Sequence, residues 1–287
     1  MPEKGALRTA LLTTLAMIAF AANSLLCRLA LGGETIDAAS FTTLRLASGA
    51  LMLWLVTQAG SRPVTRPLSR DWLSAAMLFL YAVTFSFAYT TLSTGTGALI
   101  LFGAVQLTMF LVGLRRGEHF SPLSWTGLAI ALAGLVYLLS PGISAPDPFG
   151  ALLMVAAGIG WGVYSLRGQG ASHPLHGNAR NFLLALPMAL LVSLVFYDDR
   201  LLTPSGMLIA IFSGAVASGL GYIIWYAALK GLSATGAATV QLSVPVIAAF
   251  GGVMLLSEAV TTRLIIASAA TLGGVALALT QRRRAGS

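Results

Sequence analysis

The chain alternates between long apolar runs and short polar breaks along its whole length. A helix needs roughly 20 apolar residues to cross about 30 Å of hydrocarbon, and ten runs have about that length. None of these runs alternates between apolar and polar positions, as the strands of a membrane β-barrel do. We therefore predict an all-α polytopic membrane protein with ten transmembrane helices. The runs are residues 8–27, 39–59, 73–91, 96–114, 123–140, 149–167, 179–197, 207–229, 235–256 and 263–280.

The breaks between the runs contain helix breakers or charges, as in Gly32-Gly33 and Pro141-Gly142. No break is long enough for a soluble domain, so we expect the function to reside among the helices. The first run is followed by Arg28 instead of a small-residue cleavage site, which favours a retained helix over a signal peptide.

The composition agrees with a membrane location, because 57% of the 287 residues are hydrophobic and 9% are Asp, Glu, Lys or Arg. Soluble domains carry about 25% charged residues. A soluble fold of this size would lack the charges to cover its surface. Cys27 is the one cysteine, so no disulfide can form within the chain.

The basic residues are distributed unevenly between the two sides of the predicted bundle. With a cytoplasmic N-terminus, 13 of the 17 Lys and Arg residues lie inside and 3 lie outside, while Arg45 lies within the second helix. An excess of cytoplasmic basic residues is the usual rule for helical membrane proteins. We predict a bacterial-type inner (plasma) membrane location with both termini in the cytoplasm. The net charge of +8 then reflects topology, and we expect the lipid bilayer and a small molecule as partners, not nucleic acid. The inside residues are Lys4, Arg8, Arg62, Arg66, Arg70, Arg115, Arg116, Arg167, Arg180, Lys230, Arg282, Arg283 and Arg284.

The two halves of the chain resemble each other at a shift of 140 residues. Glu118 then falls on Glu258, within a register that holds for more than 40 residues. We predict two repeats, at residues 1–145 and 146–287. Each repeat has five helices, and an odd number requires opposite orientations in the membrane. Inverted repeats are a common basis of alternating access, with substrate near the midplane between the halves.

Diffuse motifs extend over nearly the whole chain. They are Ala228-Leu229-Lys230, Ala237-Ala238, Pro245-Val246, Glu258, Gly273-Gly274-Val275, Phe149-Gly150-Ala151 and Trp161-Gly162-Val163-Tyr164 in the second half, and Leu44-Arg45-Leu46, Glu118 and Gly127 to Gly134 in the first. On these residues the chain resembles the ten-helix EamA-type family of the drug/metabolite transporter superfamily. One departure is Val105 in the fourth helix, where the ninth has Pro245.

The resemblance implies a secondary transporter that exports small organic solutes by alternating access. Within the family the chain resembles the YddG-type exporters of aromatic and some neutral amino acids. On this basis we expect amino acids and related metabolites as substrates, and no cofactor.

Aromatic and neutral polar side chains recur on single faces of several predicted helices, because residues three or four apart share a face. If these faces converge, they enclose a cavity with flat apolar walls and a few amide groups, which suits a zwitterion with an apolar side chain. Rings can also contact an ammonium group by a cation–π interaction of about 0.5–2 kcal/mol. The candidate substrate-binding residues are Asn23, Tyr81, Phe85, Phe102, Gln106, Trp161, Tyr164, Tyr222, Trp225 and Gln241.

Each candidate also has a purely structural interpretation. Mid-span amides such as Asn23 and Gln106 can bond neighbouring helices for about 0.6–2 kcal/mol. Pro187 and Pro245 interrupt the backbone hydrogen bonds and are candidate hinges, although helix packing explains them equally well. Arg45 can snorkel outward, pair with a carboxylate or bind a substrate carboxylate, and we favour a structural role for it.

No Asp, Glu, His or Lys lies near the centre of any predicted span. A proton relay normally requires titratable side chains at depth, so we predict transport without a buried carboxylate relay. An intramembrane enzyme is disfavoured because its paired catalytic side chains are missing at depth. No metal site is expected, because His173 and His176 fall in a predicted loop that contains Pro174.

Two alternatives within transport stay open. A nucleotide-sugar or sugar-phosphate exchanger should need more buried cations than Arg45 and Lys230, and a multidrug exporter of cations should need a buried carboxylate. Gly113 and Gly117 have the spacing of a helix-dimer motif, which alone is a weak signal, so we expect a monomer or a weak dimer.

Overall fold

The computed structural model describes residues 2–60, 72–115, 117, 120–142, 144–168, 173–232 and 234–280. Within these ranges the regular structure is helical, apart from one isolated bridge between Ile36 and Leu202. The helices are α1 (Pro2–Gly32), α2 (Ala38–Gly60), α3 (Trp72–Ala88), α4 (Thr94–Arg115), α5 (Pro122–Leu139), α6 (Pro148–Gly168), α7 (Pro174–Val195), α8 (Pro204–Phe212), the π-helix η2 (Ser213–Leu220), α9 (Gly221–Leu229), α10 (Ala234–Gln241), α11 (Ser243–Leu256) and α12 (Thr262–Thr280).

Nine helical segments of the described chain are long and apolar enough to cross a membrane, and α3, with 17 residues, is a further apolar helix. Each of the predicted runs coincides with one of these segments, so the predicted all-α membrane architecture is confirmed. Several boundaries were wrong by three residues or more: α1 begins at Pro2 and not at residue 8, and α8 begins at Pro204 and not at residue 207. Helix α1 continues to Gly32, and α3 ends at Ala88 because a turn follows it. Helix α7 begins already at Pro174, a residue type favoured in the first helical position, so His176 lies in its first turn and not in a loop.

Polar side chains in the breaks cap several helices. Asp37 Oδ1 accepts a hydrogen bond from the Ser40 backbone N–H (2.8 Å) at the start of α2. Ser121 and Thr203 do the same for α5 and α8, and each is followed by a proline. Such caps satisfy N–H groups that have no partner inside the first turn. The breaks therefore fix where these helices begin.

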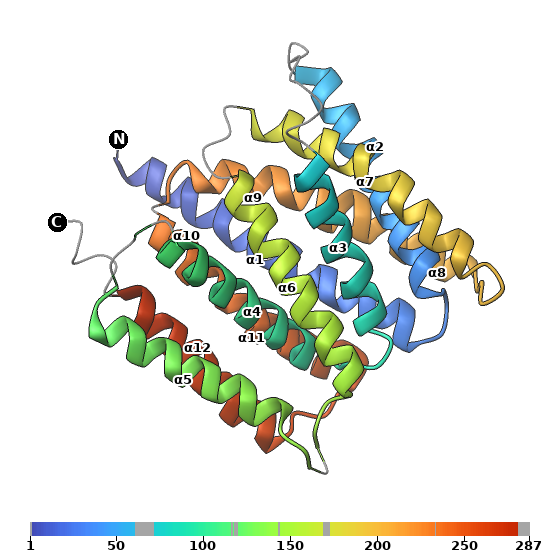
Figure 1. Ribbon diagram of the computed structural model, residues 1–287. Helices are drawn as coiled ribbons and strands as arrows, with labels where there is room; N and C mark the ends of the chain where they lie inside the picture. The colour runs from blue at the N-terminus through green and yellow to red at the C-terminus, as the bar shows by residue number, and fades with distance from the viewer. Residues whose placement is uncertain are drawn as a thin grey trace.

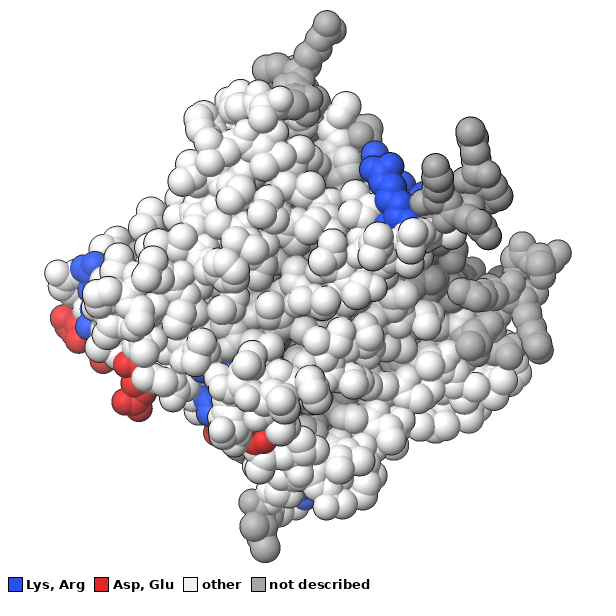
Figure 2. Space-filling view, turned by 180° about the vertical axis from the view of Figure 1, so that it is seen from behind, with Lys and Arg blue, Asp and Glu red and all other residues white. Residues whose placement is uncertain are grey.

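The outer surface of the bundle is apolar, whereas polar side chains are buried inside. Leu51, Leu191 and Val195 are 56%, 62% and 79% exposed. Figure 2 shows one face with a broad uncharged middle, and its Lys, Arg, Asp and Glu side chains lie toward the ends. Monomeric soluble proteins rarely expose contiguous apolar patches larger than a few hundred Å². This surface is that of a multi-span membrane protein.

Helices that are distant in sequence pack side by side. Helices α5 and α12 pair along one edge of the bundle, and α2 and α7 pair at the opposite edge (Figure 1). Between these pairs, α6 packs on α3 and α4, while α1 packs on α9 and α11. Helices α8, η2 and α9 count here as one span, and α10 and α11 as another. Exchanging spans five positions apart then leaves the α5–α12 and α2–α7 contacts unchanged, and it converts α3–α6 into α1–α9 and α4–α6 into α1–α11, both of which are also present.

Glycines on α6 allow this helix to lie directly against two neighbours. A Cβ atom at Gly158 would lie 2.7 Å from the Leu101 carbonyl oxygen of α4, and one at Gly160 would lie 2.9 Å from the Met77 carbonyl oxygen of α3. Real Cβ atoms do not approach this closely, so only glycine fits. The close packing holds α6 between α3 and α4 and brings Trp161 to the centre of the bundle.

The proline and glycine candidates differ in their local structure. Helix α7 continues through Pro187 to Val195. Pro245 lies in the first turn of α11, just after the break that follows Gln241, where a missing N–H is tolerated.

Gly117 has φ 80° and follows the end of α4, so Gly113 and Gly117 do not form one helix face, contrary to the spacing argument. Glu118 lies outside the described residues.

Candidate substrate-binding site

A cavity of about 390 Å³, the main cavity, lies between α4, α6, α9, α10 and α12. Its lining comes from the C-terminal halves of α4, α6 and α12 and from the whole length of α9, so it lies toward the end of the bundle where α1 begins and α12 ends. Small-molecule pockets have about 300–1,000 Å³, and this cavity is near the lower limit. Its described lining is aliphatic, aromatic, hydroxyl and amide, with no charged side chain. The lining includes five of the candidates: Gln106, Trp161, Tyr222, Trp225 and Gln241.

A second space of about 20 Å³, the inner void, lies deeper in the bundle. Trp161 and Tyr222 line both spaces, and their ring centroids are 5.1 Å apart. The two rings therefore separate the main cavity from the inner void, which has room for about one water molecule. Four further candidates line the inner void: Asn23, Tyr81, Phe85 and Phe102.

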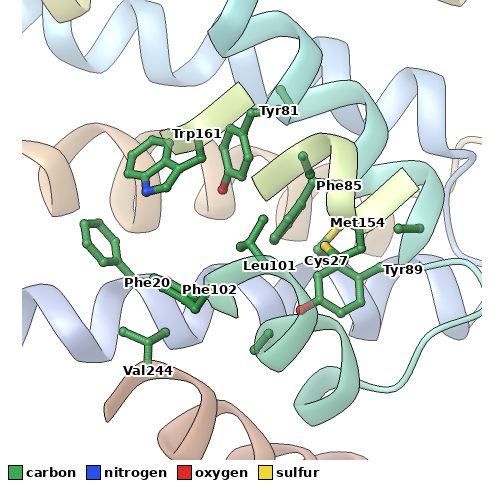
Figure 3. Close-up of a cluster of buried hydrophobic side chains, with 14 of the residues drawn as sticks. Phe20, Cys27, Tyr81, Phe85, Tyr89, Leu101, Phe102, Met154, Trp161 and Val244 are labelled. Carbon is green, nitrogen blue, oxygen red and sulfur yellow. The ribbon is translucent and has the colours of Figure 1, made fainter. Parts of the chain in front are cut away.

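Rings from four helices meet around these spaces. Figure 3 shows Trp161, Tyr81 and Phe85 on one side of the space and Phe20 and Phe102 on the other. The Trp161 ring centroid lies 5.0 Å from that of Tyr81 and 6.1 Å from that of Phe20. Because these side chains come from α1, α3, α4 and α6, the cluster exists only in the folded bundle.

A polar network lies against the inner void. The Tyr81 hydroxyl accepts hydrogen bonds from Asn23 Nδ2 (3.1 Å) and Arg45 Nη2 (2.9 Å). Arg45 Nε donates to Ser218 Oγ (3.3 Å), and Ser213 Oγ donates to Asn23 Oδ1 (2.7 Å). The network thus connects α1, α2 and α3 to η2.

Sequence reasoning missed the contribution of η2, which supplies both serines of this network. The local signal was the group of glycines in the eighth predicted run. A Cβ atom at Gly214 would lie 2.1 Å from the Arg45 carbonyl oxygen, so this glycine allows η2 to lie against α2. π-Helical segments occur frequently at functional sites, because the extra residue re-aims the side chains around it.

Gln241 and Tyr164 both form hydrogen bonds inside the bundle, but of the two only Gln241 lines the main cavity. Gln241 Nε2 donates to the Ala237 carbonyl oxygen at 3.3 Å, within its own helix. Tyr164 is not among the lining residues of either space, contrary to the prediction, because its hydroxyl is hydrogen-bonded to Asn178 and Asn181 of α7. Its position three residues after Trp161 brings the two rings to 5.7 Å but turns the hydroxyl away from the main cavity.

A polar cluster of Arg28, Thr94 and Glu258, the outer cluster, lies at the end of the bundle opposite the main cavity. Arg28 Nε lies 3.4 Å from Glu258 Oε1, and the Glu258 carboxylate accepts the Thr94 N–H at 2.9 and 3.0 Å. Arg28 Nη1 also donates to the carbonyl oxygens of Tyr89 and Thr90, both at 3.0 Å. These contacts tie α1 and the start of α4 to the segment between α11 and α12.

Comparison with known proteins identifies the family. A profile of the EamA-like transporter family matches residues 148–280. The threonine/homoserine exporter RhtA of Salmonella typhimurium is 30% identical over 252 residues, which cover 83% of this chain and 80% of RhtA. The chain belongs to the EamA-like transporter family.

Other similarities to this EamA-like transporter extend over its whole length. An uncharacterised protein of Pseudomonas aeruginosa is 53% identical over 282 residues, covering 98% of this chain and 97% of the relative. A solved crystal structure has the same fold, with a TM-score of 0.68, 22% identity, and coverage of 94% of this chain and 97% of that chain. The predicted membership in the drug/metabolite transporter superfamily is thus confirmed, and the protein is a membrane transporter.

Proposed function

We propose that this EamA-like transporter exports small organic solutes by alternating access, with aromatic and neutral amino acids and related metabolites as its substrates. The observation that carries the proposal is the main cavity, which has an uncharged described lining and lies toward one end of the bundle, while the outer cluster joins helices at the other end. We infer from this arrangement a state that is accessible from the cavity side only, which is the state from which an alternating-access exporter loads its substrate.

The cavity lining supports a zwitterion with an apolar body. Trp161, Tyr222 and Trp225 offer flat apolar surfaces, and Gln106 and Gln241 offer amide donors and acceptors. Polar groups of this kind can pair with an ammonium and a carboxylate without a fixed countercharge, while buried unpaired polar groups would be costly. The name of RhtA, a threonine/homoserine exporter, is consistent with amino acids as the substrate class.

The proposal includes two inverted repeats, residues 1–145 and 146–287, and hinges at Pro187 and Pro245. The exchange symmetry of the helix contacts supports the repeats, as do two reciprocal contacts between α5 and α12. A Cβ atom at Gly134 would lie 2.7 Å from Thr271 Oγ1, and one at Gly274 would lie 2.6 Å from the Ala131 nitrogen. A shift of 140 residues relates these two contacts to each other.

The proposed orientation places both termini in the cytoplasm of a cell with this protein in its inner (plasma) membrane. It follows from the distribution of Lys and Arg between the two sides. The main cavity then opens to the cytoplasm, and the outer cluster closes the external side. The proposal includes no buried carboxylate relay, because the described acidic side chains lie in loops or at helix ends. They are Glu34, Asp37, Asp147, Asp198, Asp199 and Glu258.

The test is transport by the purified protein in proteoliposomes. Labelled phenylalanine, tryptophan, leucine and threonine are offered with and without a pH gradient, and protein-free liposomes measure the leak. We expect saturable flux of the amino acids down their own gradients, unchanged by the pH gradient. Accumulation driven by the pH gradient would refute transport without proton coupling, and absence of amino-acid flux would redirect the search to phosphorylated sugars or drugs.

A further inference from the structure

Arg45 is a guanidinium enclosed in the membrane part of the bundle. Its side chain neither snorkels to the surface nor pairs with a carboxylate, because the residue is 2% exposed and no described Asp or Glu forms an ion pair with it. The titratable groups that act on it are Tyr81, Tyr222 and Cys27, none of which is a carboxyl group. Two of the structural interpretations drawn from the sequence are therefore wrong.

The neutral groups around Arg45 orient its charge but do not neutralise it. Nη2 and Nε donate to the Tyr81 and Ser218 hydroxyls, and Cζ lies 5.1 and 4.9 Å from the ring centroids of Tyr81 and Phe85. Nη1 is buried and has no hydrogen-bond partner in the described structure. Because a guanidinium stays protonated in proteins, a full positive charge with one free donor group remains inside.

A buried charge without a countercharge is costly, and in membrane proteins such residues usually mark the path of a substrate. Arg45 is in position for this role, because it is one hydrogen bond away from the inner void. Tyr81 accepts its hydrogen bond and, together with Asn23, lines that void. Trp161 and Tyr222 line both this void and the main cavity.

We propose that Arg45 is the anion-binding group of this transporter, and that its substrates carry a carboxylate. The inference rests on the proposed function and narrows its substrate class. The apolar body of the substrate occupies the main cavity, and the carboxylate passes through the inner void to the guanidinium, whose Nη1 is the donor without a partner in the described structure. The Asn23 amide is a second donor within this network. Since the void has about 20 Å³, the Trp161 and Tyr222 rings must separate to admit the carboxylate.

Substrate discrimination in wild-type protein gives the first test. Three compounds share one ring: phenylalanine, 3-phenylpropanoate, which lacks the amino group, and phenylalaninamide, which lacks the carboxylate. In proteoliposomes we expect the two carboxylates to move at least tenfold faster than the amide, above the leak of protein-free liposomes. In detergent, the two carboxylates should raise the melting temperature of the protein and the amide should not.

Variants of Arg45 give the second test. Arg45→Gln keeps an amide that can bond Tyr81 and Ser218 but removes the charge, so we expect carboxylate flux to fall at least tenfold while amide flux stays unchanged. Because an uncompensated charge is removed, this variant should melt at the same temperature as the wild type or higher. Arg45→Lys should keep the preference for carboxylates at a reduced rate. The control is Arg200→Gln, which removes an exposed arginine that stacks on Tyr197 and should transport as the wild type does.

The outcomes separate this inference from the proposed function. Equal flux of the amide and the carboxylates, or wild-type carboxylate flux in Arg45→Gln, overturns the role of Arg45 and leaves amino-acid export standing. A lower melting temperature of Arg45→Gln with an equal loss of all fluxes assigns Arg45 a structural role and also overturns the inference. Absence of flux for all three compounds contradicts the proposed function itself.

Discussion

At the scale of the residue, Trp161 has the most central position in the candidate site. It lines both the main cavity and the inner void, and its ring centroid lies within 5.0 to 6.1 Å of those of Tyr81, Tyr222, Tyr164 and Phe20. An aromatic pair contributes about 0.5–1.5 kcal/mol beyond the burial of its area. A substrate ring in the main cavity would therefore gain binding energy from Trp161 directly.

Trp161→Ala should lower amino-acid flux about tenfold in proteoliposomes, since about 1.4 kcal/mol corresponds to a factor of ten. Trp161→Phe keeps a ring, so its amino-acid flux should lie between those of Trp161→Ala and the wild type. This variant distinguishes the loss of the ring contact from a general loss of packing. The matched control is Trp54→Ala on α2, whose tryptophan is 46% exposed on the outer surface and should be dispensable for flux. If both alanine variants insert into the membrane and transport equally well, Trp161 is not part of the binding site.

At the scale of the element, close helix packing determines the shape of the site. Helix α6 carries Trp161 and contacts α3 and α4 through glycines, while η2 contacts α2 through Gly214. Small residues let helices in a membrane approach closely, where van der Waals packing replaces the hydrophobic effect as the driving force. A side chain added at such a contact displaces a backbone, not only another side chain.

Gly158→Ala should destabilise the protein by about 1–3 kcal/mol, the usual cost of overpacking, because its Cβ atom would lie 2.7 Å from a backbone oxygen of α4. The same substitution at Gly273 of α12 is the control, since no atom of the described residues outside its own helix lies within 4 Å of a Cβ atom there. Thermal unfolding of the two variants in detergent distinguishes them. A Gly158→Ala variant as stable as Gly273→Ala would show that α6 can move away from α4 without cost.

At the scale of the whole molecule, the proposed transport cycle depends on the outer cluster opening while the main cavity closes. Glu258 reaches this cluster because Ser257, which follows the end of α11 at Leu256, has φ 54° and turns the chain back. The Glu258 N–H then donates to the Gly252 carbonyl oxygen at 3.1 Å. Cys27 precedes Arg28, is 0% exposed and is the one cysteine of the chain, so it serves as a native probe of this closure.

Glu258→Ala should favour the outward-open state, because it removes the carboxylate that holds both Arg28 and the first N–H of α4. We expect a membrane-impermeant maleimide, added from outside to right-side-out vesicles, to label Cys27 at least tenfold faster in this variant than in the wild type. Asp199→Ala, a change of an exposed carboxylate in the loop between α7 and α8, should leave the rate unchanged. Faster labelling only from the cytoplasmic side would contradict the proposed orientation.

The sequence by itself determined the number and type of the apolar helical segments and most of their positions, but not the divisions at η2 and between α10 and α11. The reason is that a bilayer imposes one length and one composition on every span, whatever the rest of the fold. Errors arose where capping and turn geometry mattered, as at Pro174 and Ala88. The family was also accessible from short motifs, because they lie along the chain and need no knowledge of packing.

Only the tertiary structure decided which faces meet. Periodicity places Trp161 and Tyr164 on one side of α6, yet one lines the main cavity and the other bonds to α7, because the rotation of a helix depends on which neighbours it contacts. The same holds for Arg45, whose partners Tyr81 and Ser218 lie 36 and 173 residues away in the chain. Contacts at such separations depend on how glycine-lined helices fit together, and no local pattern in the sequence specifies that fit.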